Sequence, residues 1–228
     1  MDATLLNAAI DAADLSSVQR LLDEAANLVD AVDHAGMTPL MRAVISRRRS
    51  AAIVRCLLDR GARVDAPSAA GFTALHLAID VDDASPDNAA AIIGCLVGRG
   101  ADLEQRQCYG WTPLLCAVVR GRTREARYLL DLGADPNATF PADTFPAYCA
   151  GHSALMAAAT APGGSEMVQI LLEAGADPLR LDRTGMNFFQ VTAALRSEQR
   201  QGRFGDPIER AEAVVRSWTA GRTERTLS

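Results

Sequence analysis

One short segment recurs along this chain at intervals of 34, 35, 39, 41 and 34 residues. Each copy opens on Thr, Ser or Asn and leads into an apolar run; the copies begin at Thr4, Thr38, Thr73, Thr112, Ser153 and Asn187. Most copies are followed by a Leu-Leu-x-x-Gly-Ala-type segment. A period near 33 with this content is typical of a solenoid of stacked helix pairs. It predicts an all-α chain of about five to six stacked helix pairs with a C-terminal capping helix.

The repeat that starts at Thr112 shows why the segment should fold as two helices. Thr112 is placed to cap a helix with its hydroxyl, and Pro113 follows at the first helical position, where a missing N–H costs nothing. Apolar residues then recur at helical spacing up to Gly121, which predicts a tight turn. The second helix is predicted over residues 123–132, and Gly133 ends it.

Neither helix is long enough to be stable alone, so stacking must supply the core. The motifs Thr112-Pro113-Leu114 and Gly133-Ala134-Asp135, together with the period, resemble the ankyrin-repeat family over residues 1–185. This resemblance implies antiparallel helix pairs joined by hairpin-like fingers, with partners docking on the finger tips and the exposed side of the first helices. The chain departs from the family pattern where the helix-starting Pro is replaced by Leu5, Ala74, Ala154 and Phe188.

We expect one domain over residues 1–218, followed by a polar tail over 219–228. Its repeats are predicted near residues 1–33, 34–67, 68–106, 107–147, 148–181 and 182–218, the last as a cap. Pro207 and Glu209 mark the start of the capping helix. An apolar stripe along that helix predicts that its Arg and Glu residues face outward.

Composition narrows the functional classes. The 228 residues carry a net charge of -5, and all 23 basic residues are Arg, so the basic footprint of a nucleic-acid binder is missing. The absence of Lys fits either GC-rich coding or selection against lysine-directed modification. Five Cys without metal-ligand spacing favour a reducing compartment. With no targeting segment and no membrane-length apolar run, we expect a cytoplasmic protein without cofactor, metal or membrane contact, and a monomer is favoured.

Two repeats are longer than the others. Residues 80–88 contain four Asp and predict a solvated loop, a partner contact or a calcium site, although the Gly and bidentate Glu of calcium loops are missing. Residues 138–148 form a long finger with Phe140, Phe145 and Tyr148. Aromatic residues in such a finger either pack on neighbouring repeats or contact a partner, and the sequence leaves both open.

The residue just before each capping position lies on a finger and is not required by the predicted fold. These positions hold Met37, Phe72, Trp111, His152 and Met186. The remaining candidates for a partner surface are Arg106, Tyr109, Arg120 and Tyr148. Trp, Tyr and Arg are enriched at interface hot spots, so the surface is predicted to centre on Trp111, although these rings would also suit packing between fingers.

The sequence predicts a non-catalytic module that binds another protein in a scaffold, inhibitor, immunity or effector role. The chain has no nucleophile elbow, phosphate-binding Gly loop or zinc motif. His76 is expected to form hydrogen bonds within its own repeat, and nothing in the sequence would orient a Cys149–His152 pair. The alternative is an enzyme or small-molecule binder that uses residues 138–148 as a lid over a central groove.

Overall fold

The computed structural model describes residues 3–80, 86–141, 151–199 and 207–225. The chain divides into two compact units, Met1–Cys108 and Tyr109–Ser228. Most of the two insertions, together with Phe145 and Tyr148, lies outside the described residues. Within the described ranges all regular elements are helices, as the period predicts.

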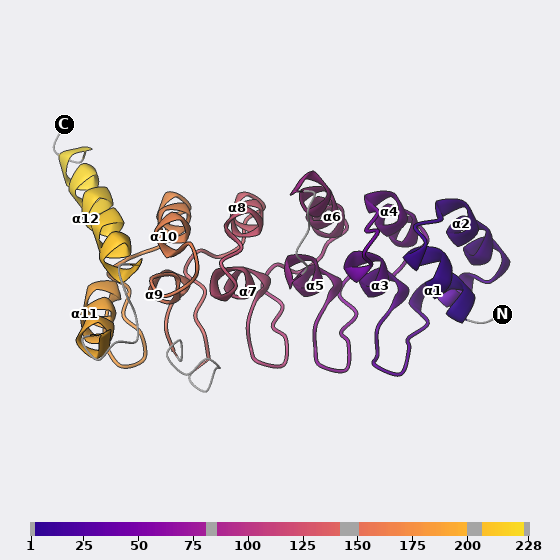
Figure 1. Ribbon diagram of the computed structural model, residues 1–228, viewed down its shortest axis with the longest axis horizontal. Coiled ribbons are helices and arrows are strands. Elements are labelled where there is room, and N and C mark those ends of the chain that lie inside the picture. The colour runs from indigo at the N-terminus through magenta and orange to yellow at the C-terminus, as the bar shows by residue number, and fades with distance from the viewer. Residues whose placement is uncertain (1–2, 81–85, 142–150, 200–206, 226–228) are drawn as a thin grey trace. The chain divides into compact units, whose positions relative to one another are not determined.

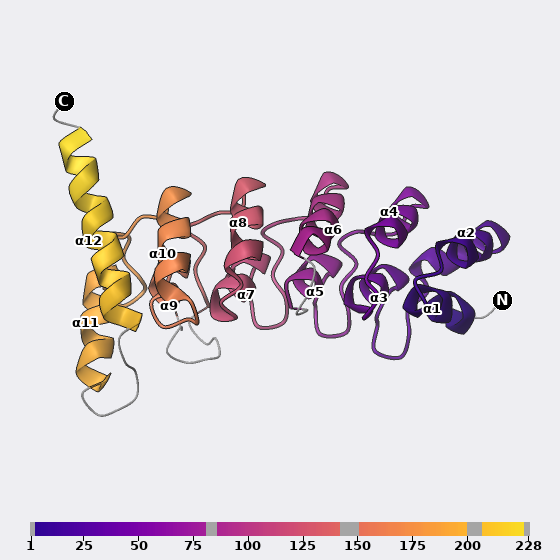
Figure 2. The same ribbon diagram turned by 45° about the horizontal axis from the view of Figure 1, so that its top comes forward.

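The first unit is a stack of three antiparallel helix pairs. Its elements are α1 (Ala3–Asp11), α2 (Leu15–Glu24), the 3-10 helix η1 (Ala26–Asp30), α3 (Pro39–Ile45), α4 (Ala51–Asp59), α5 (Ala74–Asp80) and α6 (Pro86–Gly98). Helices α1, α3 and α5 form one row and α2, α4 and α6 form the other (Figures 1 and 2). Each helix therefore packs on its own partner and on its neighbours in the same row.

The second unit continues the same pattern and ends in a longer pair. Its helices are α7 (Pro113–Val119), α8 (Thr123–Asp131), α9 (Ala154–Ala158), α10 (Gly164–Glu173), α11 (Phe188–Gln199) and α12 (Pro207–Arg225). Helix α9 packs on α7, α10 and α11, while α12 packs mainly on α10. None of the helices within the described ranges combines the length and apolarity needed to cross a membrane.

Hydroxyl caps fix where the first helix of a repeat begins. The side chains of Thr38, Thr112 and Ser153 each accept the N–H three residues ahead, at 3.2, 3.3 and 3.3 Å. Pro39 and Pro113 then occupy the first helical position. The predicted cap at Thr112 is thus confirmed, and each such cap contributes about 1 kcal/mol to helix stability.

The core lies along the facing sides of the two rows in each unit. Val44 and Leu57 are fully buried in the first unit, as Leu114 and Leu129 are in the second. Burial of such a side chain contributes about 1.5–3 kcal/mol. Helices of 5 to 10 residues, such as α9 and α10, are too short to be stable in isolation, so this packing between repeats holds the fold together.

Polar side chains at the repeat exits connect consecutive repeats. In each case a side-chain oxygen accepts a backbone N–H from the next repeat; the pairs are Asp30 with Arg63 at 3.0 Å, Asp65 with Asp102 at 3.2 Å, and Asn137 with Asp177 at 2.9 Å. These bonds satisfy backbone donors that would otherwise depend on water. They also fix the spacing between neighbouring fingers.

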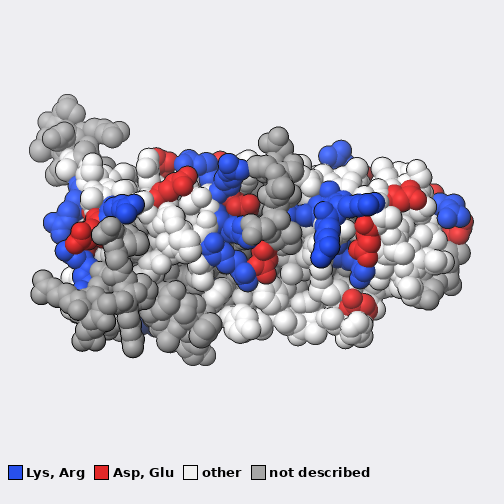
Figure 3. Space-filling model, viewed as in Figure 1, with Lys and Arg blue, Asp and Glu red and all other residues white. Residues whose placement is uncertain are grey.

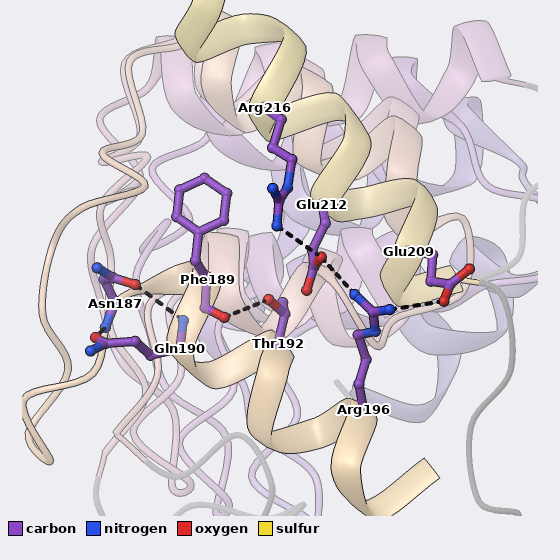
Figure 4. Close-up of polar contacts among 8 residues, drawn as sticks. All are labelled: Asn187, Phe189, Gln190, Thr192, Arg196, Glu209, Glu212 and Arg216. Atoms are coloured by element: carbon purple, nitrogen blue, oxygen red, sulfur yellow. Dashed lines mark hydrogen bonds and ion pairs between the residues drawn. The ribbon is translucent and has the colours of Figure 1, made fainter. Parts of the chain in front are cut away.

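Helix α11 starts at Asn187-Phe188, without the Thr-Pro pair that begins α3 and α7. The N–H of Asn187 donates to Gln190 Oε1 at 2.9 Å, and the N–H of Gln190 donates to Asn187 Oδ1 at 3.1 Å. Figure 4 shows this reciprocal contact, which satisfies two orphan donors of the first turn. An amide pair therefore replaces the hydroxyl cap at the last repeat.

A charged network joins α11 to α12 (Figure 4). Arg196 binds Glu209 at 3.1 Å and Glu212 at 3.0 Å, and Arg216 lies 3.7 Å from Glu212. The prediction that every Glu of the capping helix faces outward is wrong for Glu212, whose side chain is 8% exposed. Two guanidinium groups compensate the buried carboxylate, which sequence periodicity does not reveal. Helix α12 also runs to Arg225, through part of the segment expected to be a tail.

Candidate functional site

Three aromatic rings form a cluster on the first two fingers of the second unit. The Trp111 ring lies 5.6 Å from Phe140 in an edge-to-face arrangement, and 5.9 Å from Tyr109. Phe140 is 1% exposed and Trp111 is 8% exposed, whereas Tyr109 is 56% exposed. The two buried rings thus form a platform that presents Tyr109 to solvent.

The beginning of the 138–148 insertion is tightly integrated with the repeat that follows. Phe140 N–H donates to the His152 carbonyl at 2.9 Å, and Ala154 N–H donates to the Ala138 carbonyl at 2.8 Å. Thr139 and Ser153 form an antiparallel bridge between these two bonds. Residues 138–141 therefore follow the packing alternative, while 142–148 lie outside the described residues.

Gly110 allows the two fingers to approach this closely. Its φ is +72°, in the left-handed region, and a Cβ there would collide with the Pro141 ring. Both constraints exclude a side chain at this position. The turn beneath Tyr109 is therefore fixed by a neighbour from the next finger.

The burial of Trp111 changes the predicted surface. The sequence placed Trp111 at its centre and treated the position as not required by the fold. The ring packs on Phe140 instead, so it offers little area to a partner in this conformation. Tyr109 is the member of the cluster that presents an accessible ring.

His152 lies at the base of the finger that carries Phe140, beside the carboxylate of Asp182 from the following finger. Its Nε2 is 3.9 Å from Asp182 Oδ2, and the two side chains are 13% and 1% exposed. Burial lowers the pKa of His152, and the charge of Asp182 offsets this only in part. Asp182 was not predicted as a site residue, although the Asp-x-x-Gly spacing at Asp182 and Asp33 marks carboxylates that shape finger turns.

The fingers of the first unit hold Met37 and Phe72. The N–H of Met37 donates to Asp33 Oδ1 at 2.9 Å, and this bond is the main reason that the pKa of Asp33 lies below its usual value. Phe72 is half-buried and packs edge-on against His76 at 6.1 Å. The prediction for His76 is confirmed, because its Nδ1 lies 2.9 Å from the Thr73 hydroxyl of the same repeat.

The other predicted residues are spread over both units. Arg106 is exposed in the first unit, Arg120 is exposed at the end of α7, and Met186 is half-buried on the last finger. On the face drawn in Figure 3, basic and acidic side chains are interspersed over each unit. A charge pattern of this kind offers local ion pairs rather than a continuous basic track.

Several exposed apolar side chains were not predicted as site residues. They are Leu5, Val32 and Ile45 in the first unit, and Leu179 and Leu181 in the second. Leu179 and Leu181 are 61% and 60% exposed on the finger that also carries Asp182. Periodicity gives no signal for Leu179 and Leu181, because these two residues lie outside the helices.

Metal-ligating side chains do not gather into a site among the described residues. No group of three or more His, Cys, Asp or Glu in the described part of the chain could hold a metal ion. Burial raises the pKa of the Cys56 thiol, which makes it a poor nucleophile at neutral pH. The geometry offers contact area and hydrogen-bonding groups on the fingers and on the first helix of each repeat.

Comparisons with known proteins agree with the architecture. The family model for ankyrin repeats matches residues 5–89 and 82–182. The ankyrin repeat domain ABAYE2397 of Acinetobacter baumannii AYE is 24% identical, with 93% of this chain and 98% of that chain covered and a TM-score of 0.70. No curated protein sequence gives a significant match.

Two further solved structures share the fold. A chain in the complex of the predatory endopeptidase Bd0816 from Bdellovibrio bacteriovorus with immunity protein Bd3460 is 24% identical, with 92% of this chain and 97% of that chain covered and a TM-score of 0.66. The ankyrin repeat domain of Bcl-3 is 25% identical, with 93% and 97% covered and a TM-score of 0.67. At these identities the likeness describes the backbone rather than a particular partner.

Proposed function

Because the chain belongs to the ankyrin-repeat family, we propose that it is a non-catalytic module that binds another protein through its fingers and the first helix of each repeat. Ankyrin repeats are protein–protein interaction modules, and the fold is generally a non-enzymatic scaffold. The role that follows is that of a scaffold, inhibitor, immunity protein or effector. The partner is a folded or extended protein surface.

The observation that carries this proposal is the exposure of Tyr109 above a buried platform. Tyr supplies a large, rigid ring with a polar tip and is among the residues enriched at interface hot spots. Trp111 and Phe140 hold the neighbouring backbone in place before any partner arrives. A side chain already ordered in this way loses less conformational entropy on binding.

Each unit also carries exposed apolar side chains. In the second unit Leu181 is exposed on the last finger. In the first unit Ile45 is 40% exposed at the end of α3, which also carries the Arg42 partner of Asp11. An apolar side chain beside an ion pair provides contact area together with directional polar groups, as protein interfaces require.

The alternative of an enzyme or small-molecule site beneath residues 138–148 gains no support from the described part of that segment. Phe140 packs against Trp111 rather than covering a groove. We therefore favour the binding module.

Site-specific photocrosslinking tests the proposal. A benzophenone amino acid replaces Tyr109 in one variant and Tyr128, a half-buried Tyr of α8, in a matched control. Both proteins are irradiated in lysate of the source cells, and crosslinked bands are identified by mass spectrometry. We expect a discrete adduct from position 109 that position 128 does not give.

The outcome is decisive in either direction. Adducts of the same protein from both positions, or none from position 109, would contradict a partner surface at Tyr109. Competition by excess unlabelled protein, but not by its Tyr109→Ala variant, would support it further.

A further inference from the structure

The contact between His152 and Asp182 joins two fingers of the second unit. Asp182 Oδ1 accepts the Thr184 hydroxyl at 2.6 Å and the N–H groups of Thr184 and Met186 at 2.8 and 3.0 Å. Asp182 Oδ2 is buried and has no hydrogen-bond partner among the described residues. The Nε2 of His152 lies 3.9 Å from this oxygen.

Among the described residues, few charges act on the His152 ring. From the finger packed against it, Asp182 provides the attraction, and Arg183 lies beside Gly151. The described residues of its own finger, 139–141, carry no charged side chain. Burial outweighs the attraction of Asp182 and holds the pKa of His152 below its ordinary value, so the ring is neutral at neutral pH.

The backbone of His152 is tied directly to the aromatic platform. Its carbonyl accepts the N–H of Phe140, and the Phe140 ring supports Trp111 beneath Tyr109. A movement of His152 toward solvent would therefore disturb the hydrogen bond that positions Phe140. A continuous series of contacts, through Phe140 and Trp111, therefore connects His152 to the exposed Tyr109.

We propose that His152 and Asp182 form a pH-sensitive latch. At neutral pH the latch keeps Phe140 and Trp111 packed beneath Tyr109, which is the closed arrangement, and on acidification it releases them. The regulatory meaning of this latch rests on the proposed function, since Tyr109 is the partner contact argued above. The conformational change itself does not depend on any partner.

The lowered pKa of His152 determines how the stability of the closed arrangement changes with pH. A His152 ring released into water takes up a proton near the ordinary pKa of 6.5, whereas the buried ring takes it up only at lower pH. The closed arrangement thus has its full stability above about pH 6.5. It loses stability as the pH falls toward the lower pKa of the buried ring.

Trp111 fluorescence in the 228-residue chain provides the test, with Trp218→Phe as the background so that Trp111 is the only indole. We expect a sigmoidal change with a midpoint below 6.5. The change should be lost in His152→Gln and retained in His34→Gln, which alters an exposed His of the first unit. Asp182→Asn, which can still accept the turn's hydrogen bonds, should move the midpoint to lower pH.

Each result separates the possibilities. A flat curve in the parent, a transition that survives His152→Gln, or a midpoint at the ordinary histidine value would overturn the latch. An unchanged midpoint in Asp182→Asn would show that Asp182 is not part of the latch. If the transition is found but Tyr109 gives no specific crosslink at neutral pH, the latch stands and the proposed partner surface fails.

Discussion

The indole of Trp111 stands edge-on to the Phe140 ring, with 5.6 Å between centroids and 85° between ring planes. These residues come from consecutive fingers and are 29 positions apart in sequence. Their contact makes the first part of the long insertion a structural support for the finger before it. Four predictions follow from this and from related contacts.

Trp111→Ala should destabilise the protein by about 3–5 kcal/mol, because it removes a buried aromatic side chain and leaves a cavity above Phe140. Tyr109→Ala should cost less than about 0.5 kcal/mol, since that ring is mostly exposed. Urea unfolding followed by circular dichroism measures both changes. Equal stability of the two variants would show that the indole is not part of the core.

Gly110→Ala should be more harmful than Gly185→Ala. The two glycines occupy equivalent finger positions with φ of +72° and +79°, but only at Gly110 would a Cβ meet a neighbour, Pro141. The backbone term alone costs about 1–2 kcal/mol, which Gly185→Ala should show. Thermal melting of both variants tests the difference, and Pro141→Ala should partly rescue Gly110→Ala. A similar loss in both would mean that the fingers separate without cost.

Glu212→Gln should weaken the attachment of α12 by about 1–3 kcal/mol, because it leaves the Arg196 guanidinium without its buried partner. Glu209→Gln is the matched control: Glu209 binds the same Arg196, but its side chain is 65% exposed, so its loss should cost less than about 1 kcal/mol. Trp218 fluorescence during urea unfolding reports on α12. Added salt should diminish the effect of Glu209→Gln more than that of Glu212→Gln. The reverse order would contradict the burial of Glu212.

Asp65→Asn should stabilise the protein at neutral pH by about 0.5–1 kcal/mol. Burial raises the pKa of Asp65, the N–H of Asp102 opposes this, and the Asp102 charge adds to the increase. When the pKa of a carboxyl group is higher in the folded state than in the unfolded state, the group stabilises the fold at pH values below its pKa in the unfolded state. This contribution is lost as the pH rises through its pKa in the folded state. An amide avoids that loss and still accepts the Asp102 N–H, as Asn137 does for Asp177.

The free energy of unfolding, measured from pH 3 to pH 7, tests the Asp65→Asn prediction. The advantage of Asp65→Asn should shrink as the pH falls. Asn137→Asp, the reciprocal change, should lower stability at neutral pH. If Asp65→Asn destabilises the protein at pH 7, the charge of Asp65 is favourable and the argument is wrong.

The repeats, the helix starts and the ankyrin architecture could be read from the sequence because they depend on local chemistry. The Thr112 hydroxyl reaches an N–H only three residues away, and Pro113 restricts its own backbone. The bond between His76 and Thr73 is equally local. Such short-range features repeat with the period, so each copy reinforces the prediction from the others.

The tertiary structure decided which of these side chains are exposed. Sequence spacing places Tyr109 and Trp111 on the same finger, but only the approach of Phe140 buries one ring and leaves the other accessible. Glu212 fits an outward position by periodicity, and Arg196 of another helix draws it inward. Burial depends on neighbours that are distant in sequence, so a local pattern specifies the helices but does not determine which surface remains for a partner.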